Sequence, residues 1–216
     1  LGKPLLDLVT RDLTALATHC YSSDDRCFYP AINDGTRLHP ENSNEGVGYC
    51  PPGKLTPVSA DGLLFLSYAK AYRLTHNDLF RETAESLAEG MGWTKLEVPD
   101  TYDGKVIQPD PHGWVNLGQN DVCALFGLLE LYRATDDQRV LTSAQSLGNQ
   151  LLNRYSVDGW TASHRTEGEA NIDTALPLAL LHLVAASDGS TGDLPAFYAN
   201  NTYFDAKIVI RKRQTA

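Results

Sequence analysis

One block of the sequence recurs at a fixed offset of 60 residues, and this repeat limits the folds that the chain can adopt. Residues 64–88 and 124–148 share six identities in 25 aligned positions. The identical positions, numbered in the first copy, are Tyr72, Arg73, Thr75, Ala84, Ser86 and Leu87. A constant spacing of this kind indicates one supersecondary unit used repeatedly. The unit is predicted to be a helix, a tight turn at Arg-x-Thr, a second helix and a long connector.

Hydrophobic periodicity predicts that each unit is a pair of antiparallel helices. The expected helices are 4–19, 60–74, 78–90, 120–134, 137–153 and about 171–186. The first helix of each central pair is almost wholly apolar and the second is amphipathic, as a buried inner helix and a half-exposed outer helix require. Asp61 and Asn77 supply capping side chains at the starts of two of these helices, and Gly90 and Gly92 close one of them.

These helices make about three hairpins, which predicts an all-α fold that is part of an (α/α) toroid. A closed ring needs about twice this number, so we expect residues 1–216 to be a single toroid domain or the C-terminal half of one. The chain starts at Leu1 without a charged-then-apolar leader, which suggests a processed or internal start and a missing N-terminal half. Near the C-terminus, Tyr203, Phe204 and residues 208–210 alternate in a way that predicts one or two short strands.

The chain is acidic, and this balance narrows the partners that it can bind. Its net charge is −9, whereas a nucleic-acid-binding chain needs a basic stripe to neutralise phosphates. An anionic substrate would need a local basic pocket or a metal ion to offset the general repulsion. The longest apolar stretch, 176–186, is about half as long as a membrane span. We therefore expect neither a nucleic-acid nor a membrane partner.

The cysteines leave the cellular compartment open. Cys20 and Cys27 bracket a short polar loop, and a disulfide there would favour a periplasmic or extracellular protein. The alternative is that all four cysteines are reduced thiols in a cytosolic protein. Zinc is disfavoured because the sequence has no CxxC pair or close Cys/His cluster.

Three connectors carry the polar and aromatic residues that suit a substrate site. In the first, Asp34, Tyr49 and Lys54 give the mixture expected where a sugar acid binds. His39 and Glu41 are weak candidates for metal ligands, since their spacing matches no strong template. The alternative for this segment is a solvated loop in which Asp34 forms an Asx-turn.

The other two connectors have similar alternatives. Trp114 could stack on a sugar ring beside His112, or it could plug the helix ends. His164 and Arg165 are the candidate catalytic residues, as proton-transfer or carboxylate-binding groups, although Arg165 could instead form an exposed ion pair with Glu167.

Several phrases of the sequence resemble one known family. They are 28–36, 48–54 leading into 60–62, 68–75, 124–135 and 203–207. Together they resemble the later half of family 2 polysaccharide lyases, the periplasmic pectate lyases and exopolygalacturonate lyases. No GxSxG, HExxH, P-loop or dinucleotide fingerprint points to another reaction.

The resemblance implies an (α/α) toroid that cleaves polygalacturonate by β-elimination in the periplasm or outside the cell. It implies a divalent cation, Mn²⁺ or Ca²⁺, that neutralises the uronate carboxylate, and an arginine base that removes the C5 proton. The family's metal-binding histidines and catalytic arginine belong to the earlier half of that fold, and no residue here matches them. The implied partner is an acidic polysaccharide or oligogalacturonide. The residues expected to contact it are Asp34, Tyr49, Lys54, His112, Trp114, His164 and Arg165.

Two other functions fit the same fold. A toroid glycoside hydrolase could use Asp34 with Glu167 or Asp173 as its carboxylate pair. Asp173, however, is expected inside the first turn of the last helix, where it would interact with the helix dipole. A half-toroid without catalytic activity could bind a glycan or another protein chain.

Overall fold

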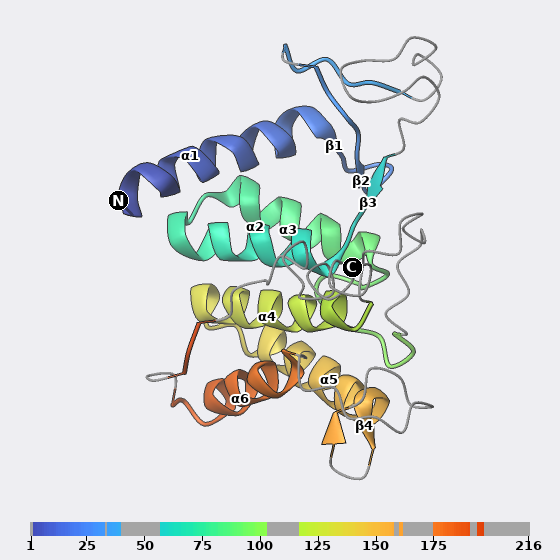
Figure 1. The fold of residues 1–216 in the computed structure, drawn as a ribbon, viewed down its shortest axis with the longest axis vertical. Coiled ribbons are helices and arrows are strands. Elements are labelled where there is room, and N and C mark those ends of the chain that lie inside the picture. Colours follow the sequence, from blue (N-terminus) through green and yellow to red (C-terminus); the bar gives the residue numbers. More distant parts are fainter. Residues whose placement is uncertain are drawn as a thin grey trace, which may run out of the picture.

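A computed structural model describes residues 2–32, 34–39, 57–102, 117–157, 160–161, 175–190 and 194–196 (Figure 1). The helices in this part of the chain are α1 (Gly2–Ala15), η1 (Leu16–Cys20, one π-helical turn), α2 (Gly62–Thr75), α3 (Asp78–Gly90), α4 (Leu117–Thr135), α5 (Gln138–Tyr155) and α6 (Leu176–Ser187). The strands are β1 (Tyr21–Ser22), β2 (Cys27–Phe28), β3 (Val58–Ser59), β4 (Ser156–Val157) and β5 (Trp160–Thr161). The predicted all-α fold with short strands is confirmed. None of the described helices combines the length and apolar character that a membrane crossing requires.

The repeat is confirmed by the turns that join α2 to α3 and α4 to α5. His76 and Asp136 end the first helix of each pair in the left-handed conformation, with φ of 52° and 54°. The next residue, Asn77 or Asp137, then caps the second helix by accepting a hydrogen bond from a backbone N–H two residues further on. The two turns therefore have the same backbone and side-chain hydrogen bonds, as an offset of 60 residues predicts.

The inner helices α2, α4 and α6 run parallel to one another. Asn120, near the start of α4, lies against Gly62 at the start of α2. Arg73, near the end of α2, forms an ion pair with Glu130 in the last third of α4. α6 runs antiparallel to α5, because Gln145 of α5 contacts Ser187 at the end of α6, and Gly148, further along α5, lies against Leu183, which is earlier in α6. The outer helices α3 and α5 pack on α2 and α4. In Figure 1, α1, α2, α4 and α6 follow one another down the picture.

This arrangement gives the two ends of the helical layers different roles. The short hairpin turns lie at one end. At the other, which we call the connector end, α3 and α5 finish and α2, α4 and α6 begin. The long connections between hairpins must therefore leave and return at the connector end. Strands β1, β2 and β3 lie at this end, where β1 contacts α3 through the Tyr21 and Ser86 hydroxyls, 2.7 Å apart.

Helix α4 forms the centre of the core. Every residue from Asn120 to Leu131 is buried, and most of these side chains are apolar. Gly127 allows α4 to approach α2 closely, since a Cβ atom there would lie only 2.5 Å from the Phe65 ring. Burial on all sides explains why α4 is apolar around its circumference, whereas α2 and α6 each keep an exposed face, with Leu63 and Leu181 among the exposed side chains.

The short strands were predicted only in part. β1, β2 and β3 form an antiparallel sheet between α1 and α2, and β4 pairs with β5 after α5. The strands expected at 203–210 lie outside the described residues. In the three-stranded sheet Cys27 lies opposite Ser22, two residues after Cys20, and the thiols of Cys20 and Cys27 are both free in the structure.

The last helix begins later than expected. α6 starts at Leu176 with Ala175 at its N-cap, rather than at about 171. Pro177 fits this start, because proline is tolerated in the first turn of a helix. Asp173 therefore cannot be in the first turn of α6, and that interpretation was wrong. The position of Asp173 itself lies outside the described residues.

Candidate functional site

The predicted site residues fall, in sequence, within the connections that leave from and return to the connector end. All of them lie in sequence between an element that finishes at this end and one that begins there. Among them, Asp34 and His39 are described. The predicted site residues outside the described part of the chain are Glu41, Tyr49, Lys54, His112, Trp114, His164, Arg165 and Glu167.

Asp34 lies in an exposed Asx-turn. Its Oδ1 accepts a hydrogen bond from the Thr36 backbone N–H at 2.9 Å, and Gly35 between them has a φ of +86°. The hydrogen bond from this N–H favours the ionised carboxylate and lowers the pKa of Asp34. A general acid needs the opposite shift, so Asp34 is poorly suited to that role. Asp34 thus forms the Asx-turn that the sequence allows, and its contact with a substrate stays a prediction.

Arg37 holds this turn against the end of η1, and sequence reasoning missed it. Its Nε donates to the carbonyl oxygen of His19 at 2.6 Å, and its Nη2 donates to the carbonyl oxygen of Tyr21. Leu38 N–H also donates to the carbonyl oxygen of Pro30 at 2.8 Å. No sequence signal marks an arginine whose partners are backbone carbonyl groups. Its role at this site is to position the Asp34 turn.

His39 lies beside an aromatic ring. The ring centroids of His39 and Tyr29 are 4.7 Å apart, and Tyr29 Oη donates to Asp25 Oδ2 at 3.0 Å. This bond to a carboxylate favours the protonated phenol and raises the pKa of Tyr29 to about 12. Within the described residues, no three or more His, Cys, Asp or Glu side chains are grouped so that they could hold a metal ion. The prediction of His39 with Glu41 as metal ligands stays untested.

A buried carboxylate joins three elements at the connector end. Asp121 of α4 has a side chain only 1% exposed. Its Oδ2 accepts from Arg154 Nη1 of α5 at 2.7 Å, and its Oδ1 accepts from Tyr102 Oη at 3.2 Å. Arg154 Nη2 donates to the carbonyl oxygen of Tyr102 at 2.6 Å. We call Tyr102, Asp121 and Arg154 the connector clamp.

A second buried charge network lies nearer the turn end. Glu130 of α4 binds Arg73 of α2 and, at 3.2 Å, Arg133 of its own helix. His182 of α6 donates from Nε2 to the carbonyl oxygen of Pro195 at 2.9 Å, so its Nδ1 accepts from Arg133 Nη2 at 2.7 Å. This network connects the three inner helices and satisfies the buried carboxylate of Glu130.

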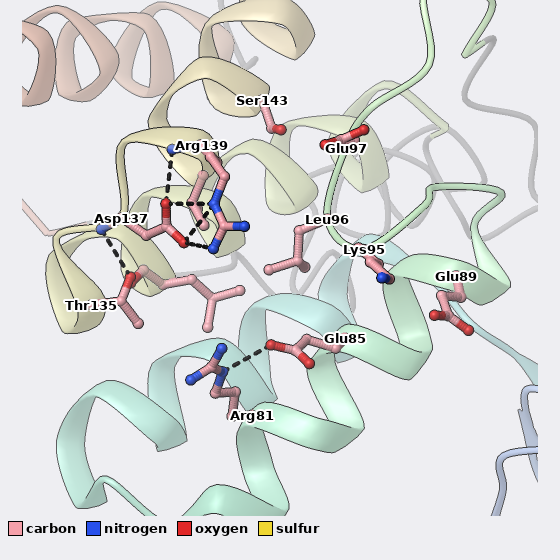
Figure 2. A pocket seen from close by; sticks show the side chains of 12 residues that line it. Arg81, Glu85, Glu89, Lys95, Leu96, Glu97, Thr135, Asp137, Arg139 and Ser143 are labelled. Carbon is pink, nitrogen blue, oxygen red and sulfur yellow. Dashed lines mark hydrogen bonds and ion pairs between the residues drawn. The ribbon is translucent and has the colours of Figure 1, made fainter.

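A cavity of about 610 Å³ lies between the outer helices, and none of the predicted site residues is among the residues that line it (Figure 2). Its lining residues are Arg81, Glu85, Glu89, Lys95, Leu96, Glu97, Leu131, Thr135, Asp137, Arg139, Val140 and Ser143. Arg81 is paired with Glu85 at 2.8 Å and Arg139 with Asp137 at 2.7 Å. Because its cations are largely neutralised and its carboxylates outnumber them, this cavity suits a polyanionic substrate poorly.

Comparison with known families identifies the class of protein that these features belong to. The family model described as periplasmic pectate lyase matches residues 1–207. The chain therefore belongs to the periplasmic pectate lyase family, and the resemblance to family 2 polysaccharide lyases is confirmed. This membership supports a polysaccharide lyase function in general terms.

Proposed function

We propose that this protein cleaves polygalacturonate or oligogalacturonides by β-elimination, in the periplasm or outside the cell. The observation that carries the proposal is the match to the periplasmic pectate lyase family over residues 1–207. The fold supports it, because parallel inner helices bring all the long connectors to one end of the helical layers. Binding residues are commonly carried by loops that a rigid scaffold positions.

The residue types on the connectors match the chemistry of a uronate chain. Lys54 and Arg165 would pair with carboxylates, and Trp114 would stack on a sugar ring. His164 is the candidate for proton transfer beside Arg165. Local cations of this kind would offset the repulsion between a polyanion and a chain of net charge −9.

A divalent cation, Mn²⁺ or Ca²⁺, is part of the proposal. When bound, it would neutralise the uronate carboxylate and so acidify the C5 proton. The described residues contain no cluster that fits such an ion, so we assign no ligands to it. Its involvement is tested by comparing activity with added cation against activity in EDTA.

The test is the release of unsaturated uronate from polygalacturonate, measured by ultraviolet absorbance with added Mn²⁺ or Ca²⁺. We expect an absorbing product, and we expect His164→Ala and Arg165→Ala to lower kcat/KM by at least about 100-fold, as the loss of proton-transfer groups does. Arg139→Ala is the control, because this arginine is exposed and paired with Asp137 on the outer face.

New reducing ends without the absorbing product would contradict the lyase proposal and support a glycoside hydrolase. In that case the lowered pKa of Asp34 would favour the base or nucleophile role for it over the role of general acid. Binding of the polymer without either product would support a glycan-binding protein without catalytic activity.

A further inference from the structure

We infer that the connector clamp, through Arg154, is a positioning device for the substrate site. This inference rests on the proposed function, because it concerns the two connectors that carry His112, Trp114, His164 and Arg165. Arg154 does not itself need to touch the substrate. Its role is to hold the starts of both connectors in one fixed relation to α4.

The geometry of the clamp requires an arginine. Its two terminal nitrogens bind different elements: Nη1 donates to Asp121 of α4 and Nη2 donates to the carbonyl oxygen of Tyr102. A planar guanidinium can make both bonds in fixed directions, whereas a lysine ammonium is a point charge without that fork. Replacing Arg154 with lysine would therefore keep the charge near Asp121 but lose the two-element bridge.

The clamp lies at the start of both connectors. Tyr102 is the last described residue before the segment that leads to α4, and its ring packs edge-on against Trp93 at 5.6 Å. Trp93 is itself buried and packs against Phe65 of α2. Arg154 lies one residue before the end of α5, where β4 and the last connector begin. One side chain thus fixes the starts of two segments that are distant in sequence.

Stability alone does not explain a buried pair of this kind. A well-packed apolar pair of similar volume is often as stabilising as a buried ion pair, because both charges lose their hydration. Buried ion pairs do specify orientation in some proteins, since only one arrangement satisfies all their hydrogen bonds. The Arg139–Asp137 pair on the same helix differs, because the side chain of Arg139 is 84% exposed. It provides a matched control at the other end of α5.

The experiment compares Arg154→Lys with Arg139→Lys in the full chain. Reactive groups must be aligned closely for catalysis, so we expect Arg154→Lys to lower kcat/KM on polygalacturonate about 10-fold or more, mainly through kcat. We expect the melting temperature of both variants to stay within a few degrees of the parent protein. Arg139→Lys should retain the parent kcat and KM. A kcat/KM for Arg154→Lys within twofold of the parent value would overturn the inference.

A second measurement separates this inference from the proposed function. Lys105 and Arg165 are trypsin sites within the two connectors. We expect Arg154→Lys to speed cleavage at both sites several-fold under native conditions, while Arg139→Lys leaves the rates unchanged. If the parent protein releases no unsaturated uronate, the proposed function fails and the cleavage rates still decide the positioning role. Unchanged rates at both sites would refute it.

The variant Asp121→Asn with Arg154→Met serves if the lysine variant folds poorly. It removes both charges together, so no buried carboxylate is left without its cation. The inference expects this folded variant to show the same loss in kcat and the same faster cleavage. Parent-like kcat and parent-like cleavage rates would contradict it.

Discussion

The contact between the starts of α2 and α4 permits a quantitative test of the inner layer. A Cβ atom at position 62 would overlap the backbone carbonyl oxygen of Asn120 and lie 2.9 Å from the backbone nitrogen of Ala124. Because both are backbone atoms, no side-chain rotation can relieve the contact. A carbon–oxygen contact needs about 3.3 Å, so Gly62→Ala has to push the two helices apart by roughly 1 Å. The same shift would break the buried hydrogen bond from Gly62 N–H to Asn120 Oδ1.

The expected loss in the free energy of unfolding follows from these two effects. Overpacking at a closely packed site costs about 1–3 kcal/mol. Leaving the buried amide oxygen of Asn120 without its donor costs about 1–3 kcal/mol more. Alanine in place of glycine returns up to about 1 kcal/mol of helix propensity. We therefore expect Gly62→Ala to lower stability by roughly 2–5 kcal/mol, a large share of the total for a domain of this kind.

The measurement is urea unfolding followed by far-ultraviolet circular dichroism, with Gly2→Ala as the control. Gly2 is also the first residue of a helix, but a Cβ atom there would meet nothing within 4 Å. We expect the control to be neutral or slightly stabilising. If Gly62→Ala lowers stability by less than about 1 kcal/mol with an unchanged m-value, the parallel packing of α2 against α4 is not as described.

Three further predictions concern single side chains. Asp61 caps α2 by accepting a hydrogen bond from Leu64 N–H at 2.7 Å, yet burial disfavours its charged form and raises its pKa. Because an amide oxygen can accept the same bond without a charge, Asp61→Asn should match or exceed the parent melting temperature. Asp61→Ala loses the cap and should lower the free energy of unfolding by about 1 kcal/mol. Burial raises the pKa of Cys123 from 9.0 to about 12, so above pH 9 the unfolded chain binds fewer protons than the folded one and stability falls with rising pH. The Cys123→Ala variant should lack this contribution to the slope of stability against pH, which is up to about 1.4 kcal/mol per pH unit. Equal slopes for the variant and the parent protein between pH 9 and 11 would contradict the prediction. Lys95 is exposed with a φ of 49°, so Lys95→Gly should raise stability by about 1 kcal/mol, and a fall in its melting temperature would argue against that backbone.

The hairpin turns could be predicted in detail because their chemistry is local. A left-handed residue followed by Asn or Asp and a new helix is encoded within a few positions, so His76–Asn77 and Asp136–Asp137 give the same turn. The start of α6 also has a local signal, because Pro177 lies in its first turn.

Interactions between helices could not be predicted in the same way. Arg73 and Arg133 occupy equivalent positions in the repeat, yet both bind Glu130, whose own counterpart 60 residues earlier is Lys70. A repeat in sequence therefore does not imply a repeat in side-chain pairing. The connector clamp joins residues that are 33 and 52 positions apart along the chain, and no periodic pattern relates them.

The topology explains why the candidate site could be assigned to one end of the fold although its residues are scattered in sequence. Parallel inner helices require each long connection to start and finish at the connector end, whatever its sequence is. At the turn end, by contrast, the polar residues cap helices or belong to the Arg73–Glu130–Arg133 network, so their side chains already make structural contacts. Substitutions in that network should then lower stability with little effect on the kcat of the folded protein. Arg154→Lys, which keeps a cation beside the buried Asp121 carboxylate, should lower kcat with little effect on melting temperature, and the two sets of variants together test whether fold and function are divided between the two ends.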